Sequence, residues 1–224
     1  MHPKADVVPI MARRDTRELV LQTSLALFNE LGEPNVSTNR IADEANISPG
    51  NLYYHFRNKQ DIVVELFTRF ATQLDRIIAV PVSAALRAED LWFQLHLSFE
   101  LKGHYRFLFR NPIDISSRVP SLRRAFMGLF RRERKAAEDM ISSLEQSGAM
   151  CISSREKEIL LNNLMLAMTY WIPFAEMYEE HGLQDGNVQI KSIAGALQMI
   201  IPYMAEDARA ELTNLAIFYL SHPN

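Results

Sequence analysis

A chain of 224 residues, of which 48% are apolar, can bury a sizeable core in one large domain or two modest ones, and its composition is not that of a disordered protein. The formal net charge of −3 excludes a protein coated in positive charge, so any contact with nucleic acid must come from a local basic patch. A single cysteine, Cys151, excludes an intrachain disulfide and a multi-cysteine metal site, and it is typical of a reducing cytoplasm.

The N-terminal residues 1–14 are predicted to form a flexible arm, because they lack the apolar core of a signal peptide. Arg13, Arg14 and Arg17 are candidates for contact with a DNA minor groove or with phosphates, and a solvated tail is the alternative. The longest uncharged apolar stretch, residues 159–175, is shorter than a bilayer span. We therefore expect a soluble, cytoplasmic protein with no membrane partner.

A first helix is predicted to begin at Asp15, because Glu18 follows three residues later as in a capping box. Leu19, Leu25 and Phe28 give this helix an apolar face. Gly32 is expected to end it, because glycine accepts the backbone conformation found just after a helix. We expect this helix to pack behind the segment that follows.

Two short helices joined by a tight turn are predicted next. Thr38 is expected to cap the first of them, and Asn46 follows at a turn where a left-handed backbone is needed. Ser48 and Pro49 start the second helix with a capping hydroxyl and a proline at the first helical position, and this helix ends by His55. Such a pair predicts a helix-turn-helix whose second helix enters a DNA major groove.

The sequence of this segment resembles the N-terminal domain of the tetracycline-repressor (TetR) family of bacterial regulators. The resemblance lies in the run SPGNLYYHFRNKQDIVVEL, which is preceded by STNRIADEANI and by a helix ending in FNELG. It covers roughly the first third of the chain, and its most specific part is LYYHF with Lys59 at a fixed distance. Beyond about Pro81 only the general helical plan of the family is similar.

The resemblance implies which residues contact DNA, whereas an ordinary polar helix face is the alternative. It implies that base edges are met by Asn39, Pro49, Gly50, Asn51 and Tyr54, and phosphates by Thr38, Tyr53, His55 and Lys59, with Ser48 included in the DNA-binding set. Asn can pair bidentately with adenine, and hydroxyl, imidazole and ammonium groups can donate to phosphate oxygens. Some relatives have arginine where this chain has Asn39, so no operator sequence can be transferred from them.

A long helix is predicted from Asn58, which forms a capping box with Asp61, to about Ala79. From Ala88 onward every segment is helical in pattern, and no strand pattern occurs. The expected helices cover residues 89–101, 104–110 with a stop at Pro112, 121–146, 153–181, 188–201 and 205–220. We therefore predict an all-α protein, with a three-helix DNA-binding domain and its connecting helix in residues 15–80 and a larger effector-binding and dimerisation domain in residues 81–224.

Aromatic and methionine residues are numerous in the C-terminal part, where most must be core. The same residue types also line adaptable apolar cavities. The candidates for ligand contact are Trp92, His96, Phe99, Phe126, Phe130, Tyr170 and Phe174. We interpret the run of basic residues at 123–135 as a solvated helix face with intrahelical pairs, because acidic residues share that helix.

The helix from Glu156 to Tyr178 is apolar nearly all round and therefore needs two packing partners. One face is expected to pack within its domain, and the other to join the next helix in a four-helix interface across a two-fold axis. The candidates for this interface are Leu164, Met168, Trp171, Ile193, Leu197 and Ile201.

Together with the resemblance to the TetR family, these patterns predict a homodimeric transcriptional regulator, a repressor that binds a double-stranded DNA operator and releases it when a small apolar or amphipathic effector binds. A constitutive DNA-binding scaffold whose C-terminal domain binds a protein partner is the alternative. No nucleophile with its base and no metal-ligand spacing is found, so an enzyme, a cofactor and a metal site are not expected.

Overall fold

The computed structural model describes residues 10–79, 88–178 and 187–221. Within these ranges the chain forms eleven α-helices and no β-strand, so the all-α prediction is confirmed. The chain divides into two compact units, Met1–Thr68 and Arg69–Asn224. None of the described helices is both long enough and apolar enough to cross a bilayer.

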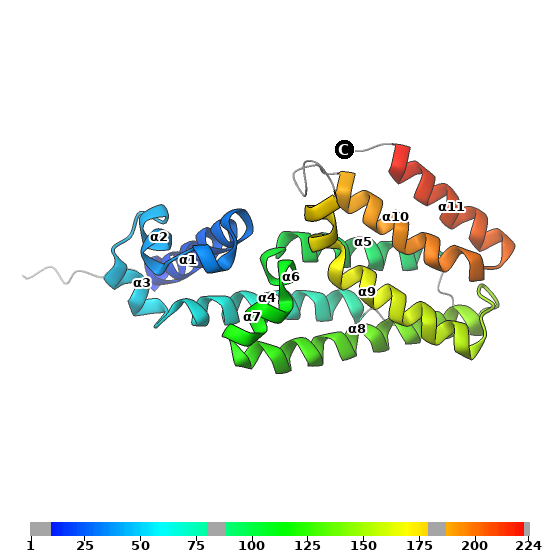
Figure 1. The fold of residues 1–224 in the computed structure, drawn as a ribbon, viewed down its shortest axis with the longest axis horizontal. Helices are drawn as coiled ribbons and strands as arrows, with labels where there is room; N and C mark the ends of the chain where they lie inside the picture. Colours follow the sequence, from blue (N-terminus) through cyan, green and yellow to red (C-terminus); the bar gives the residue numbers. More distant parts are fainter. Residues whose placement is uncertain (1–9, 80–87, 179–186, 222–224) are drawn as a thin grey trace, which may run out of the picture. The chain divides into compact units, whose positions relative to one another are not determined.

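The first unit contains α1 (Ile10–Leu31), the 3₁₀ turn η1 (Glu33–Asn35), α2 (Thr38–Glu44), α3 (Pro49–His55) and the start of α4 (Lys59–Ile78) (Figure 1). Helix α1 packs on η1, α2 and α3. It begins before the predicted start, so Asp15 lies inside the helix and does not cap it. The predicted end is confirmed, because Gly32 has a φ of 80° and its N–H bonds to the carbonyl of Phe28.

The second unit contains the rest of α4 and the helices α5 (Ala88–His104), α6 (Phe107–Arg110), α7 (Pro112–Arg118), α8 (Pro120–Gln146) and α9 (Ser154–Tyr178). It ends with α10 (Asn187–Ile200), the 3₁₀ turn η3 (Ile201–Tyr203) and α11 (Glu206–Ser221). Helix α9 packs between α8 and α10, and α10 packs in turn on α11 and α5 (Figure 1). The core of this unit lies between these long helices.

The helix end predicted before Pro112 is confirmed, because α6 ends at Arg110. Pro112 has a second role that was not predicted: it occupies the first turn of α7, where a proline loses no backbone hydrogen bond. The side chain of Asn111 caps α7 by accepting a hydrogen bond from the N–H of Asp114 (3.1 Å). A proline one residue after an Asn is thus a start signal as well as a stop signal.

The capping box at the start of α9 is confirmed. The N–H of Ser153 donates to Glu156 Oε2 (3.0 Å), and the N–H of Glu156 donates to Ser153 Oγ (3.3 Å). The side-chain and backbone hydrogen bonds from Ser153 lower the pKa of Glu156, because they favour the ionised carboxylate. The predicted end of this helix near His181 falls outside the described residues.

Candidate functional sites

Helix α3 is held by its own apolar residues and presents its polar residues to solvent. Leu52 and Phe56 are buried, as predicted, and they pack in the unit that also buries Ile41 and Ala42 of α2. Ser48 Oγ accepts a hydrogen bond from the N–H of Asn51 (3.2 Å), and Pro49 follows at the first helical position. The predicted start and end of this helix are therefore confirmed.

The turn between α2 and α3 is fixed by Asn46, which has a φ of 52°. Asn tolerates this left-handed conformation better than most residues that carry a side chain. The N–H of Ile47 closes the turn by bonding to the carbonyl of Ala42 (3.0 Å). The angle between α2 and α3 is thus set by backbone bonds and by the buried residues of both helices.

Thr38 was expected to cap α2, and this prediction is wrong. The cap is the preceding residue, Ser37, whose backbone is extended and whose Oγ accepts from the N–H of Arg40 (3.1 Å). Thr38 is the first helical residue, and its hydroxyl lies 2.9 Å from the hydroxyl of Tyr53 on α3. This bond ties the first residue of α2 to the middle of α3.

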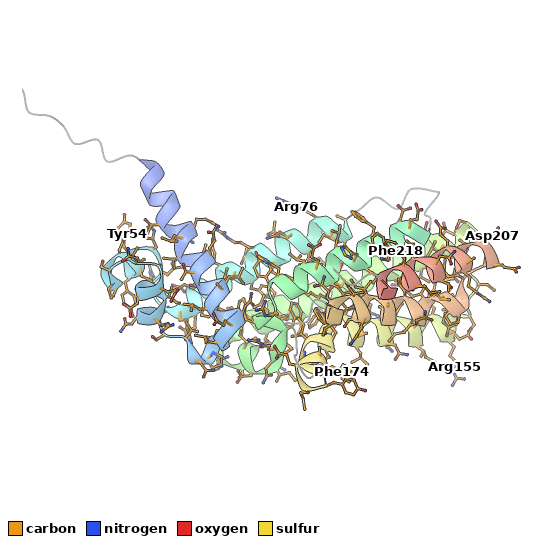
Figure 2. The ribbon with its side chains drawn as sticks, turned by 90° about the horizontal axis from the view of Figure 1, so that it is seen from above. Tyr54, Arg76, Arg155, Phe174, Asp207 and Phe218 are labelled. Carbon is orange, nitrogen blue, oxygen red and sulfur yellow. The ribbon has the colours of Figure 1, made fainter. Side chains whose placement is uncertain are left out.

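The residues proposed to meet base edges all lie on the surface of the first unit. Asn39, Pro49, Gly50, Asn51 and Tyr54 are exposed, and the ring of Tyr54 projects outward in Figure 2. At Gly50 an added Cβ would meet only Ser48 Oγ, at 4.0 Å. Among the residues that the structure describes, none comes close enough to Gly50 to require glycine at this position.

Three of the residues proposed to meet phosphates line one hollow of about 460 Å³. These are Thr38, Tyr53 and Lys59, and the wall also includes Ser37 and Arg57. His55 lies outside this wall, with its ring edge to face against Tyr54 at 5.2 Å. Hydroxyl groups and two cations around one hollow can donate several hydrogen bonds to a phosphate.

Lys59 has a second role that the sequence did not reveal. Its ammonium donates to the carbonyl oxygen of Glu33 (2.8 Å) and pairs with the Glu33 carboxylate (2.9 Å), which is almost fully buried. Two of the three ammonium donors are thus engaged in holding η1 against the start of α4. Only the third remains for a phosphate.

Arg17 is also engaged within the first unit. Its guanidinium donates to the carbonyl oxygen of His55 (3.2 Å) and to Glu65 (2.9 Å), and it lies 4.4 Å from the ring centroid of Phe56. Arg17 therefore braces the end of α3 and is not the free arginine that we expected. The side chains of Arg13 and Arg14 lie outside the described residues.

Arg57 is a candidate that sequence analysis missed. It is exposed, lines the hollow beside Lys59, and has no recorded hydrogen bond or ion pair within the described part of the chain. The signal was present in the sequence, because Arg57 directly follows Phe56 in the run that carries the family resemblance.

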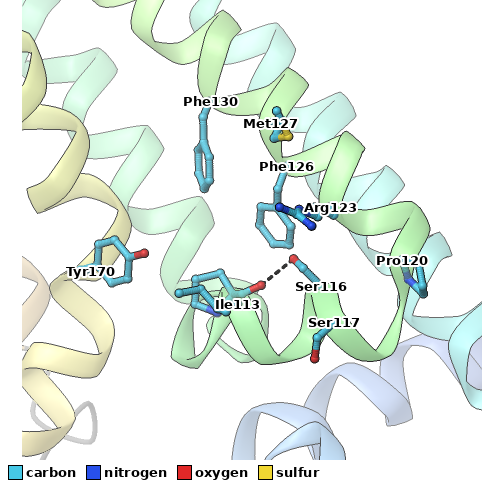
Figure 3. A pocket seen from close by; sticks show the side chains of 10 residues that line it. Ile113, Ser116, Ser117, Pro120, Arg123, Phe126, Met127, Phe130 and Tyr170 are labelled. Carbon is cyan, nitrogen blue, oxygen red and sulfur yellow. Dashed lines mark hydrogen bonds between the residues drawn. The ribbon is translucent and has the colours of Figure 1, made fainter.

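The second unit has an open pocket of about 700 Å³ between α7, α8 and α9 (Figure 3). Phe126, Phe130 and Tyr170, three of the predicted ligand residues, lie in its wall. Ile113 and Met127 add apolar surface, and Arg123 adds a fixed charge. By contrast, the hollow inside the helix bundle lined by Leu95, Ser98 and Glu133 measures only about 40 Å³. The larger of these two spaces therefore lies at the side of the bundle.

The other predicted ligand residues lie elsewhere. Phe99 is fully buried and packs against Trp171, with ring centroids 5.7 Å apart. Trp92 and His96 stack on each other along α5, at 5.2 Å, and neither lines the open pocket. Phe174 is exposed on α9 and stacks on Tyr178.

All six residues predicted for a dimer interface are buried within one chain, and so they have little surface left for a partner. They are Leu164, Met168, Trp171, Ile193, Leu197 and Ile201. Exposed apolar residues lie beside them on the outer face of α9 and α10: Leu166, Tyr170, Phe174, Met177 and Met199. These two helices border a groove of about 450 Å³. The sequence thus located the apolar helices, and the six residues predicted for the interface face the interior of the chain.

Three of the six basic residues in the run on α8 form ion pairs, and one of these pairs lies within the helix as predicted. Arg132 binds both oxygens of Asp75 (2.8 and 3.2 Å), Arg134 binds Glu158 (2.7 Å), and Lys135 binds Asp139 (2.6 Å). The hydrogen bond that the Lys135 ammonium donates to Asp139 raises the pKa of Lys135. Two of these pairs join α8 to other helices, whereas we had expected pairs within α8.

Comparisons with known proteins agree with the helix-turn-helix geometry. Residues 20–66 match the family model described as bacterial regulatory proteins, tetR family, and residues 69–212 match the TetR model described as bacterial transcriptional repressor. A TetR-family transcriptional regulator from Marinobacter aquaeolei VT8 has a solved structure with 30% sequence identity and a TM-score of 0.83, over 91% of this chain and 98% of that chain.

Other relatives are similar over less of their length or at lower identity. An HTH-type transcriptional regulator of Staphylococcus aureus (strain bovine RF122 / ET3-1) is 37% identical over 67 residues, which are 28% of this chain and 36% of that protein. The match thus spans about a third of that relative. The SmeT–triclosan complex shares the fold, with 17% identity and a TM-score of 0.61 over 87% of this chain and 94% of that chain.

Proposed function

The chain belongs to the TetR family of bacterial transcriptional regulators, and from this premise we propose that it is a homodimeric repressor that leaves a palindromic operator when a small apolar or amphipathic effector binds. It is a DNA-binding regulator and not an enzyme. We further propose that the protein acts in the cytoplasm, where its operator DNA would be, and that two chains pair through their second units.

The observation that carries the proposal is the surface of α3. Asn51 and Tyr54 are exposed on a helix that Leu52 and Phe56 anchor in the core. A helix fixed on one side and polar on the other can enter the major groove without rearranging. The hollow lined by Thr38, Tyr53 and Arg57 supplies donors for the phosphate backbone beside that groove.

A second copy of the chain is the partner that this surface needs. One helix-turn-helix reads too few base pairs to be selective, and two-fold symmetry doubles the site. The exposed apolar face of α9 and α10, with Phe174 and Met199, supports a dimer through these helices. A Cβ added to Gly195 on α10 would meet nothing within 4 Å, so another helix can approach closely there.

The open pocket supports the effector part of the proposal. Its volume of about 700 Å³ lies within the range of small-molecule sites, and its aromatic walls favour an apolar ligand. The structurally similar SmeT was solved as a complex with triclosan. The interior of the bundle is nearly filled, with a hollow of only about 40 Å³. This observation favours the alternative function, a DNA-binding scaffold whose C-terminal domain binds a protein partner.

Release would follow from a shift between two conformations. Helix α4 runs from the first unit into the second, where Phe70 packs against Phe109 (ring centroids 5.2 Å apart) and Asp75 binds Arg132 of α8. Helix α8 also carries Phe126 and Phe130 of the pocket. In the dimer, an effector could prefer a conformation in which the distance between the two recognition helices does not match the operator. Such an effector would weaken operator binding, typically by a coupling free energy of about 1–3 kcal/mol.

The experiment that tests the DNA-binding assignment compares Asn51→Ala with the parent on a mapped operator and its single-base variants. The substitution is expected to lose discrimination at one base pair per half-site, by about 1–3 kcal/mol, while affinity for random DNA is kept. Unchanged discrimination would remove Asn51 from the base-reading set.

A further inference from the structure

The open pocket of the second unit has one fixed charge in an otherwise apolar wall. Arg123 of α8 lies beside Phe126. Figure 3 shows the guanidinium of Arg123 on the side of the pocket opposite the Tyr170 hydroxyl. Ser116 and Ser117 also lie in the wall, but their hydroxyls donate to backbone carbonyls of α7, those of Pro112 and Asp114. Arg123 is therefore the pocket's main free source of hydrogen-bond donors.

Arg123 has no recorded hydrogen-bond or ion-pair partner among the described residues, unlike two arginines further along the same helix. Arg132 and Arg134 bind carboxylates, and Arg118 at the end of α7 binds Asp114 (2.8 Å). A guanidinium presents five donors in a planar fork that matches the two oxygens of a carboxylate.

The Tyr170 hydroxyl is the second donor that faces this space. It comes from α9, has no recorded hydrogen bond among the described residues, and points toward the pocket in Figure 3. Between it and Arg123 lie the apolar side chains of Ile113, Phe126 and Phe130. The pocket thus combines an apolar floor with donors and one positive charge at its sides.

We propose that this pocket selects amphipathic carboxylates, that is, an apolar body with one anionic group, and that Arg123 binds the carboxylate. The inference rests on the proposed function, because it names the chemical class of the effector. It narrows the apolar or amphipathic class predicted from the sequence. A cationic ligand would be repelled by Arg123, and a neutral one would leave its guanidinium without an ionic partner.

The test measures direct binding to the full-length protein by isothermal titration calorimetry at neutral pH, without DNA. Three probes of equal chain length are used: octanoate, octanol and octylamine, which are anionic, neutral and cationic at this pH. The parent is expected to bind octanoate more tightly than octanol, and octylamine most weakly. Arg123→Gln should weaken octanoate binding by about 10- to 100-fold and leave octanol binding unchanged.

Two further variants separate the role of Arg123 from general charge and from folding. Arg124→Gln removes the adjacent exposed arginine, which does not line the pocket, and is expected to bind octanoate as the parent does. Arg123→Lys keeps the charge without the planar fork and should recover part of the affinity. Thermal unfolding of all variants confirms that each remains folded.

Three outcomes would overturn the inference: octanol binding as tightly as octanoate, Arg123→Gln binding octanoate as the parent does, or none of the probes binding. The first two leave the effector proposal intact, because the pocket would still take an apolar ligand. Whether any small molecule releases operator DNA is measured separately, and that measurement decides the proposed function.

Discussion

The ammonium of Lys102 on α5 lies 2.6 Å from a carboxylate oxygen of Glu133 on α8, and both side chains are buried. The two groups form an ion pair, and neither has an assigned hydrogen bond among the described residues. The Lys102 ammonium also lies 5.5 Å from the ring centroid of Phe109. Burying two charges costs several kcal/mol per ion, which their mutual attraction only partly repays.

Lys102→Met is expected to destabilise the protein by about 3–5 kcal/mol, because it leaves the Glu133 carboxylate buried without its cation. The double variant Lys102→Met with Glu133→Leu should recover most of this loss. Chemical denaturation measures both free energies of unfolding. Lys135→Met, which breaks the exposed pair with Asp139, is the control and should change stability little. A single variant no less stable than the double variant would contradict this view of the pair.

Gly50→Ala separates stability from DNA binding in one substitution. A Cβ at this position has room within the chain, so the helix should be stabilised by up to about 1 kcal/mol. Operator binding should weaken, because the added methyl group would occupy the space where the backbone of α3 approaches the bases. Thermal unfolding and fluorescence anisotropy with labelled operator measure the two effects. If affinity is unchanged, position 50 does not lie against DNA.

Lys59→Met is expected to lower both the affinity for DNA and the stability of the first unit. The substitution removes both bonds to Glu33, which is 4% exposed, and should cost about 1–3 kcal/mol. Faster hydrogen exchange of the backbone amides in η1 and α2 would report this local loss of stability. Arg57→Ala is the matched comparison, since its side chain is exposed and has no recorded partner. It should weaken binding to all duplexes alike and reduce the salt slope by about 1, without a change in exchange.

Phe174→Glu is expected to yield folded monomers. The side chain is 64% exposed on α9, so a charge there leaves the core intact but opposes an apolar interface. Trp171→Glu, at a position that is 6% exposed, should instead unfold the second unit. Sedimentation velocity and circular dichroism distinguish the two results. A Phe174→Glu variant that sediments as a parent-like dimer would move the interface away from this face.

The helix-turn-helix was predictable because its boundaries are set by local chemistry. Ser48 with Pro49, Asn46 and Gly32 each fix the backbone within a few residues, and the structure confirms all of them. Ser37 and Thr38 both carry hydroxyls, and only the backbone conformation decides which one caps α2. The sequence also could not show that Lys59 is tied to Glu33, because those residues are brought together by the fold.

The second unit was less predictable, because burial there depends on distant helices. Trp171 and Phe174 lie on the same apolar helix, three positions apart, yet one is core and the other surface. Phe99 and Phe126 were both predicted as ligand residues from the same kind of pattern. Phe126 lies beside an open pocket because α7 packs against α8 there, which the sequence does not show. Apolar content alone does not distinguish core, cavity and interface.

The most direct test of the proposed function is release of operator DNA. The operator is first located by mapping the protein on its source genome, and a labelled duplex of that sequence is then bound by the purified dimer. Anisotropy is followed while apolar, amphipathic and strongly polar metabolites are added in parallel. The account predicts that an apolar or amphipathic compound releases the DNA and that Phe130→Ala, in the pocket wall, raises the concentration required. DNA that stays bound with every small molecule, but is released by a partner protein, would contradict it and favour the scaffold.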